Sequence, residues 1–325
     1  MQLSLEPVDS VTITTLVDNY FDLLLTDQGP AKRLGLPTTE TPRVAAAAVE
    51  EGQTPDVPLA EHGFSAMIGL RWGDREHRVL FDTGMSPDGL VENLRRLGYS
   101  PKDLEAIVLS HGHFDHTTGM DGLMRTLGRA SMPVYLHPEA WSRRRLLLPG
   151  REPFELPTPS KSAIEGAGFQ VIDETQPSFL LDRSLLITGE VDRTTEFEKG
   201  MPIQQAWRDG EWQPDPLVLD DQAAVLNVRD KGLVVITGCG HAGIINILRY
   251  ARKLTGIGRV YAVLGGFHLG YPFDAIIPHV CDALAEIRPQ VIVPAHCTGW
   301  KAVHALAARF PNAFVQNSVG TRFEL

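Results

Sequence analysis

Two adjacent segments decide the expected fold and site: Leu104-Glu105-Ala106-Ile107-Val108-Leu109, followed directly by Ser110-His111-Gly112-His113-Phe114-Asp115-His116. The first segment is a short apolar run of the kind that forms a buried strand. The second places three imidazoles and one carboxylate within six residues at the end of that strand. Imidazole and carboxylate suit Zn, Fe, Mn or Ni better than Ca. The pattern therefore predicts a transition-metal site rather than a chance run of surface histidines.

The spacing within this segment divides the four side chains into two pairs. On an extended turn, His111 and His113 point the same way and can bind one ion. Asp115 and His116 follow about one turn later, where they can bind a second ion.

Three further histidines also follow strand-like runs. His241 follows the apolar run 234–237 and opens a predicted helix at 242–254, whose positive end keeps the imidazole neutral. His268 follows 261–264, and His296 follows 291–293. Sites in open α/β layers lie at the carboxyl ends of strands. We therefore expect these imidazoles to converge with the first cluster.

Strand and helix patterns alternate along the whole chain, which predicts a layered α/β sandwich in a single domain of residues 1–325. A Pro-, Ala-, Thr- and Glu-rich insertion at about 29–60 reads as a long surface loop, either a lid or a disordered segment, with a helical turn at 45–48. The expected strands are 11–17, 64–72, 78–81, 104–109, 134–136, 223–228, 233–237, 259–264 and 291–293; the expected helices are 86–97, 242–254, 273–287 and one that carries Arg143–Arg145.

Composition narrows the class of partner. The 325 residues carry a formal net charge of −10, which argues against a nucleic-acid or anionic-membrane surface. No apolar run approaches the ~20 residues that cross a bilayer, and the N-terminus lacks a signal-peptide pattern. Three cysteines are too few for a disulfide framework and fit a reducing compartment. We expect a cytoplasmic protein that acts on a small molecule, and a homo-oligomer is compatible with the sequence.

The segment His111-x-His113-x-Asp115-His116 resembles the metal-binding signature of the metallo-β-lactamase superfamily, and Phe81-Asp82-Thr83-Gly84 resembles its earlier Asp-Thr-Gly turn. The resemblance implies a four-layer αββα sandwich. A narrower resemblance points to the branch named after the dihydropterin–ribofuranosylaminobenzene 5′-phosphate synthase. The segments that carry it are Val17-Asp18-Asn19, Glu61–Ser65, Thr237–Gly243, Gly265–Leu269 and His296–Gly299.

The resemblance implies one ion held by His111, His113 and His241, and a second held by Asp115, His116 and His296. Zn is favoured, with Fe or Mn as alternatives. Superfamily hydrolases usually bridge the two ions with an Asp that follows a strand, and the sequence shows no such residue. Cys239 and Glu190 are candidates for that place, whereas Asp82 is expected to form a turn or to support a ligand.

The remaining polar residues receive supporting roles. His268 is predicted to transfer a proton or contact the substrate, and Asp115 to steer the attacking water as well as bind metal. His62 is a weaker candidate for the pocket wall. The run Arg143–Arg145 could hold a phosphate, because guanidinium groups match phosphate oxygens, or could simply be solvated.

Three functions remain open. An ion with three protein ligands keeps a position for water and lowers the pKa of that water from ~15.7 toward ~7, which supplies a hydroxide nucleophile. This favours a hydrolase of a small ester, lactone or phosphoester. The narrower resemblance implies instead a transferase that joins a pterin methylene to a phosphate-bearing aromatic acceptor. The third alternative is a non-catalytic metal- or ligand-binding protein.

Overall fold

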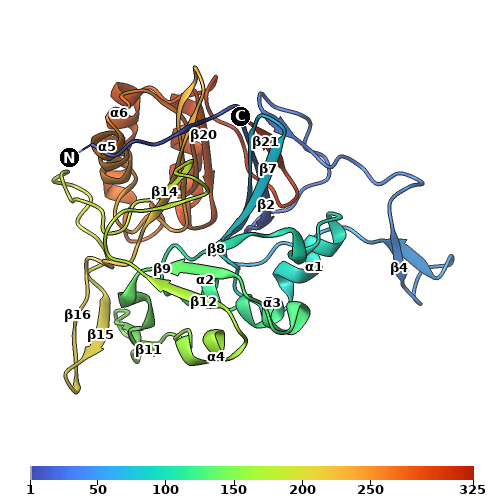
Figure 1. Ribbon diagram of the computed structural model, residues 1–325, viewed down its shortest axis with the longest axis horizontal. Coiled ribbons are helices and arrows are strands. Elements are labelled where there is room, and N and C mark those ends of the chain that lie inside the picture. Colours follow the sequence, from blue (N-terminus) through green and yellow to red (C-terminus); the bar gives the residue numbers. More distant parts are fainter. Residues whose placement is uncertain (1) are drawn as a thin grey trace.

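Two large sheets pack face to face in the computed structural model, which describes residues 2–325 (Figure 1). The first sheet has the spatial order β13 (Ser178–Leu180), β14 (Leu185–Ile187), β17 (Ala223–Val228), β18 (Gly232–Thr237), β19 (Val260–Gly266) and β20 (Val291–Ala295), and β1 (Pro7–Val8) pairs with β17. The second has the order β12 (Gln170–Asp173), β9 (Pro133–Leu136), β8 (Ala106–Val108), β7 (Arg75–Phe81), β6 (Ser65–Trp72), β2 (Ser10–Val17), β21 (Arg322–Glu324) and β3 (Ala31–Lys32).

Helices cover the outer face of each sheet (Figure 1). Helices α5 (Ile244–Thr255), α6 (Ile277–Ile287) and α7 (Trp300–Arg309) pack on the first sheet, and α1 (Gly89–Arg96), α3 (Met120–Leu127) and α4 (Lys161–Gly166) pack on the second. The short helix α2 (Phe114–Thr117) follows β8. Short 3₁₀ helices span Pro101–Asp103, Pro138–Trp141, Asp274–Ile276 and His296–Thr298. The layer order is the αββα sandwich that the family resemblance implies.

The hairpin of β17 and β18 shows why the first sheet is apolar on both faces. Alternate residues such as Leu226 and Ile236 face the second sheet in the central core, whereas Val225 and Val235 face the helices. Side chains on one strand alternate between faces, so a strand between two layers must be apolar throughout. The chain reverses at Asp230 and Gly232, both with positive φ, as the predicted hairpin requires.

Two smaller sheets extend from the body (Figure 1). One has the order β11 (Phe154–Glu155), β10 (Arg144–Leu146), β15 (Gln204–Arg208) and β16 (Glu211–Pro214). The other is the hairpin of β4 (Arg43–Ala45) and β5 (Gln53–Pro55), within the insertion.

Two local predictions were wrong. Arg143–Arg145 does not lie on a helix, since Arg144–Leu146 is strand β10. The predicted helical turn at 45–48 is also wrong, because Ala45 ends strand β4 and pairs with Gln53. Strand pairing outweighs the helix preference of Arg and Ala in both places, through the distant strand β15 at Arg144 and through the local β4–β5 hairpin at Ala45. Among the described residues, no helix is both long and apolar enough to cross a membrane.

Candidate metal centre

The carboxyl ends of strands from both large sheets meet at one edge of the sandwich and bring the predicted ligands together. β8 leads into His111 and His113, β18 leads into His241, and β20 leads into His296. His241 Nε2 lies 3.2 Å from His113 Nδ1, and His296 Nε2 lies 3.2 Å from His116 Nε2. Residues as far apart in the chain as His116 and His296, which are 180 positions apart, therefore contribute to one buried cluster.

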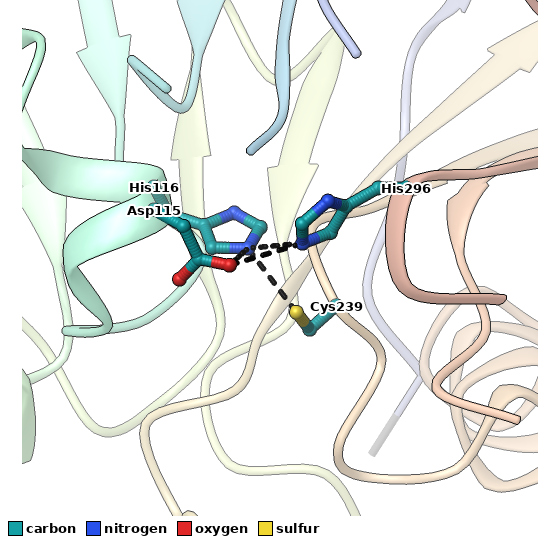
Figure 2. Close-up of side chains that lie close together, drawn as sticks. All are labelled: Asp115, His116, Cys239 and His296. Atoms are coloured by element: carbon teal, nitrogen blue, oxygen red, sulfur yellow. Dashed lines mark hydrogen bonds and ion pairs between the residues drawn. The ribbon is translucent and has the colours of Figure 1, made fainter. Parts of the chain in front are cut away.

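The ligand atoms form two adjacent groups. One group contains His111, His113 and His241, and the atoms that could bind an ion all lie within 4.8 Å of one another. The other group contains Asp115, His116, Cys239 and His296, with the same limit (Figure 2). The rings of His111 and His116 lie 4.3 Å apart between their centroids, so the two groups are neighbours. This is the division into two triads that the resemblance implies, with Cys239 added to the second.

Outer contacts fix which nitrogen of His116 carries the proton. Asp82 Oδ2 lies 2.7 Å from His116 Nδ1, and a carboxylate can only accept, so Nδ1 carries the hydrogen. Nε2, the nitrogen left to bind a metal ion, then faces His296 and Cys239, and it lies 3.1 Å from Cys239 Sγ. Asp82 thus holds the His116 ring in place, and it also accepts from the backbone N–H and hydroxyl of Ser110.

Gln204 fixes which nitrogen of His113 carries the hydrogen. Gln204 Nε2 donates to Asp215 Oδ2 at 3.0 Å, so the amide oxygen faces His113 Nε2 at 2.7 Å. His113 Nε2 therefore donates, and its Nδ1 lone pair points toward His241. Gln204 lies on β15 and gave no signal in the sequence analysis.

His111 and His296 follow the same pattern. The Ser110 hydroxyl donates to Asp82, so it accepts from His111 Nδ1, and the buried His111 Nε2 has no hydrogen-bond partner among the described residues. Asn19 Oδ1 accepts the N–H of Gly63 and lies 3.1 Å from His296 Nδ1, so His296 Nδ1 also donates. Lone pairs that converge in a buried space while the opposite nitrogens donate outward are the arrangement of metal-bound histidines. The residues present therefore fit a cation.

The pKa shifts of these side chains are compatible with a bound cation. Burial lowers the pKa of His113 to about 4, helped by Arg144, and burial with neighbouring imidazoles lowers the pKa of His111 and His241 well below the usual value. These rings are neutral and able to bind a metal. Burial alone would raise the pKa of Asp115, but the imidazoles of His116 and His296 hold it well below the usual value.

Burial alone would lower the pKa of His116, but Asp82 and Asp115 together raise it to about 9. This carboxylate environment attracts positive charge, which a metal ion would supply.

The arginine run has a structural role at its centre. Arg144 is buried and binds Asp220 through both terminal nitrogens, at 2.9 and 2.6 Å, and Asp215 through Nε at 3.0 Å. Asp220 also accepts the backbone N–H of Gly112, between the first two histidines. Arg144 therefore braces the turn that carries His111 and His113 and is not available to a phosphate, which corrects that part of the prediction. Arg143 and Arg145 instead lie over the rings of Trp207 and Trp212.

The remaining candidates divide between the cavity wall and other places. His62 and His268 line a cavity over the two groups. His62 Nε2 lies 3.5 Å from Asp115 Oδ2, and His268 forms a third cluster with Cys239 and Cys297. Glu190 lies outside these groups, with its Oε1 3.2 Å from His137 Nε2. Of the two candidates for the position of the bridging Asp, Cys239 is therefore the one that lies in a ligand group.

The comparisons with known proteins agree with this geometry. Residues 62–252 match the family model described as the metallo-beta-lactamase superfamily. The chain belongs to the metallo-β-lactamase superfamily.

Relatives place the chain within that superfamily. It is 30% identical over 271 residues to the 7,8-dihydropterin-6-methyl-4-(beta-D-ribofuranosyl)-aminobenzene-5′-phosphate synthase of Methanocaldococcus jannaschii, covering 80% of this chain and 89% of the relative. It is 33% identical over 263 residues to an uncharacterized protein of the same organism, covering 81% and 93%. A solved structure described as a metal-dependent hydrolase of the beta-lactamase superfamily aligns with a TM-score of 0.71 and 25% identity over 97% of this chain and 99% of that one. The predicted resemblance is confirmed.

Proposed function

We propose that the protein is a metal-dependent hydrolase of a small ester, lactone or phosphoester. The observation that carries the proposal is the set of imidazole lone pairs converging under an open cavity, each of four rings held by an outer hydrogen bond. A bound transition-metal ion supplies Lewis acidity and a water of lowered pKa. Similarity to a metal-dependent hydrolase over nearly the whole chain supports the same class of reaction.

We further propose two ions. The first is held by His111, His113 and His241, and the second by Asp115, His116 and His296, with Cys239 Sγ as a further donor. Sulfur and imidazole donors together favour Zn or Fe over Mn. We propose Zn as the resident ion.

The chain's own residues have distinct tasks around the substrate. Asp115 Oδ2 faces the cavity floor, 3.2 Å from His296 Nε2, where it can orient a water by accepting its proton. His268 borders the cavity, and its buried Nδ1 has no partner among the described residues. We assign His268 to proton donation toward the leaving group. Its φ of +45° is a strained backbone conformation of the kind that persists at functional sites.

A transferase is the second candidate, favoured by the 30% identity to a synthase. In that reaction the same residues would bind a dihydropterin bearing a diphosphate leaving group, with an aromatic phosphate-bearing acceptor as the second substrate. Hydrolysis and transfer both require the same cage of ligands.

The test is elemental analysis followed by turnover. Purified protein, reconstituted with Zn, Fe or Mn, is expected to bind transition metal, whereas His113→Ala is expected to lose the ion of the first group. The metal-loaded protein is then assayed with esters, lactones and phosphoesters alone, and with hydroxymethyl-dihydropterin diphosphate with and without acceptor. Turnover without acceptor supports the hydrolase; diphosphate release only with acceptor supports the transferase. Absence of metal binding after reconstitution would contradict both.

A further inference from the structure

Two cavities meet at His268. One, of about 340 Å³, lies over the metal centre and is bordered by Asp115, His241 and His268. The other, of about 260 Å³, is also bordered by His241 and His268. The His268 ring lies 4.1 Å from the His241 ring and 5.0 Å from the Phe273 ring, between centroids. The candidate proton donor thus stands at the boundary between two spaces of different character.

The first cavity has apolar walls above its polar floor. Its wall residues come from helix α2, strands β10 and β11, and the loops that follow: Phe114, Leu146, Phe154, Leu156, Met201 and Tyr271. Phe154 is 50% exposed and Tyr271 is 85% exposed. Large aromatic side chains held in solvent at the rim of a cavity offer faces on which an aromatic or alkyl group can pack.

The second cavity carries one cationic side chain, Lys199. Among residues 2–325, no carboxylate oxygen forms an ion pair within 4.0 Å of its Nζ, unlike Lys161, Lys253 and Lys301.

Glu198, the nearest acid in sequence, also borders this cavity, but its carboxylate oxygens are held by other groups and form no ion pair with Lys199 within 4.0 Å. They accept the backbone N–H groups of Ile245 and Asn246, each at 2.9 Å, at the start of α5. The positive end of α5 stabilises the charge of Glu198, and Lys199 is the side chain of this cavity that can contact an oxyanion without breaking an ion pair.

We infer that the substrate has two unlike ends, with an aromatic or alkyl group in the first cavity and an oxyanion, phosphate or carboxylate, beside Lys199. The bond that breaks then lies near His268, above the metal centre. This inference rests on the proposed function, because it takes the same site as the reaction centre. Lys199 and Phe154 become the residues that determine specificity, one for charge and the other for the apolar group.

The test measures binding to the metal-reconstituted full chain, so it does not require turnover. Three non-hydrolysable probes share one naphthyl group: the phosphonate 1-naphthylmethylphosphonate, the carboxylate 1-naphthaleneacetate and the neutral alcohol 1-naphthaleneethanol. Calorimetric Kd values are compared for wild type, Lys199→Ala, Lys199→Glu and Phe154→Ala. Lys102→Ala is the matched control, because Lys102 is an exposed lysine on the Pro101–Asp103 turn.

Lys199→Ala is expected to weaken binding of an oxyanion probe by about tenfold, the lower end for a hydrogen bond to a charged group, because Lys199 is exposed. Lys199→Glu should weaken it further, and neither change should affect the alcohol. Phe154→Ala should weaken all three probes by the same factor of about 2 to 10. The oxyanion with the larger loss identifies the anionic group.

Unchanged oxyanion binding by Lys199→Glu, or unchanged alcohol binding by Phe154→Ala, would overturn the inference. A protein that shows these selective losses but hydrolyses nothing would contradict the proposed function and leave the two-ended site standing. A protein that hydrolyses simple esters but shows no selective loss would support the proposed function and contradict the two-ended site.

Discussion

Asp82→Asn removes the charge that orients His116 while leaving the backbone undisturbed. Asp82 has a φ of +58°, a left-handed conformation that Asn tolerates better than most residues. Its side chain is fully buried, and its contacts to His116 Nδ1, Ser110 Oγ and Ser110 N are each 2.7 Å long. Asn can keep the contact with the Ser110 backbone, but its amide hydrogens then face His116 Nδ1. That favours the tautomer with the hydrogen on Nε2, the nitrogen that should bind metal.

The expected loss of metal affinity follows from the number of metal-binding side chains that the substitution affects. One imidazole of the second group loses its orienting carboxylate, and such changes typically cost 10- to 100-fold in metal affinity. This corresponds to about 1.4 to 2.8 kcal/mol. The ion held by His111, His113 and His241 should be weakened less, because Gln204 still orients His113 and His111 is affected only through the Ser110 hydroxyl, which loses its acceptor on Asp82. Competition with a chelator, followed by elemental analysis, should therefore show metal content falling toward one ion.

Glu190→Gln is the matched control. It is also a change from acid to amide beside a histidine, His137, but outside both ligand groups. We expect its metal affinity to equal that of wild type. Asp82→Asn protein that binds both ions within threefold of wild type, in a folded state shown by thermal unfolding, would refute the argument that outer hydrogen bonds select the binding nitrogen.

Further predictions concern the support of the site and its donors. Gln204→Met should weaken metal binding by about 10- to 100-fold, measured by chelator competition, because His113 loses its acceptor; an unchanged affinity would contradict this role. Arg144→Met should lower the free energy of unfolding by about 3 to 5 kcal/mol in denaturant titrations, since buried Asp220 loses its cationic partner and Asp215 keeps only Arg208. Arg143→Met, at an exposed position, should cost under about 1 kcal/mol, and equal costs at the two positions would be inconsistent with the buried network. Cys239→Ser should abolish the sulfur-to-metal charge-transfer band of cobalt-substituted protein; persistence of that band would remove Cys239 from the metal-binding set.

The protein's sequence determined its class of fold and the chemical elements of its site. Apolar runs that end in His111, His241 and His296 indicate strands whose carboxyl ends carry ligands, because periodicity and residue type are local properties. The sequence also carried the division into two triads, through the resemblance of its motifs to a known family. The observed clustering of all six predicted ligands agrees with both.

The nitrogen that four of the histidine rings turn toward the candidate metal centre is set by tertiary contacts, since the groups that hydrogen-bond the opposite nitrogens are mostly remote in sequence. Gln204 lies 91 residues from His113, and Asn19 lies 277 residues from His296, so no local pattern connects them. The same holds for Arg144, whose place in a strand is set by pairing with Ala206 and by two buried carboxylates rather than by its neighbours. The role of such a side chain can be assigned only from the folded structure, because its partners are distant in sequence.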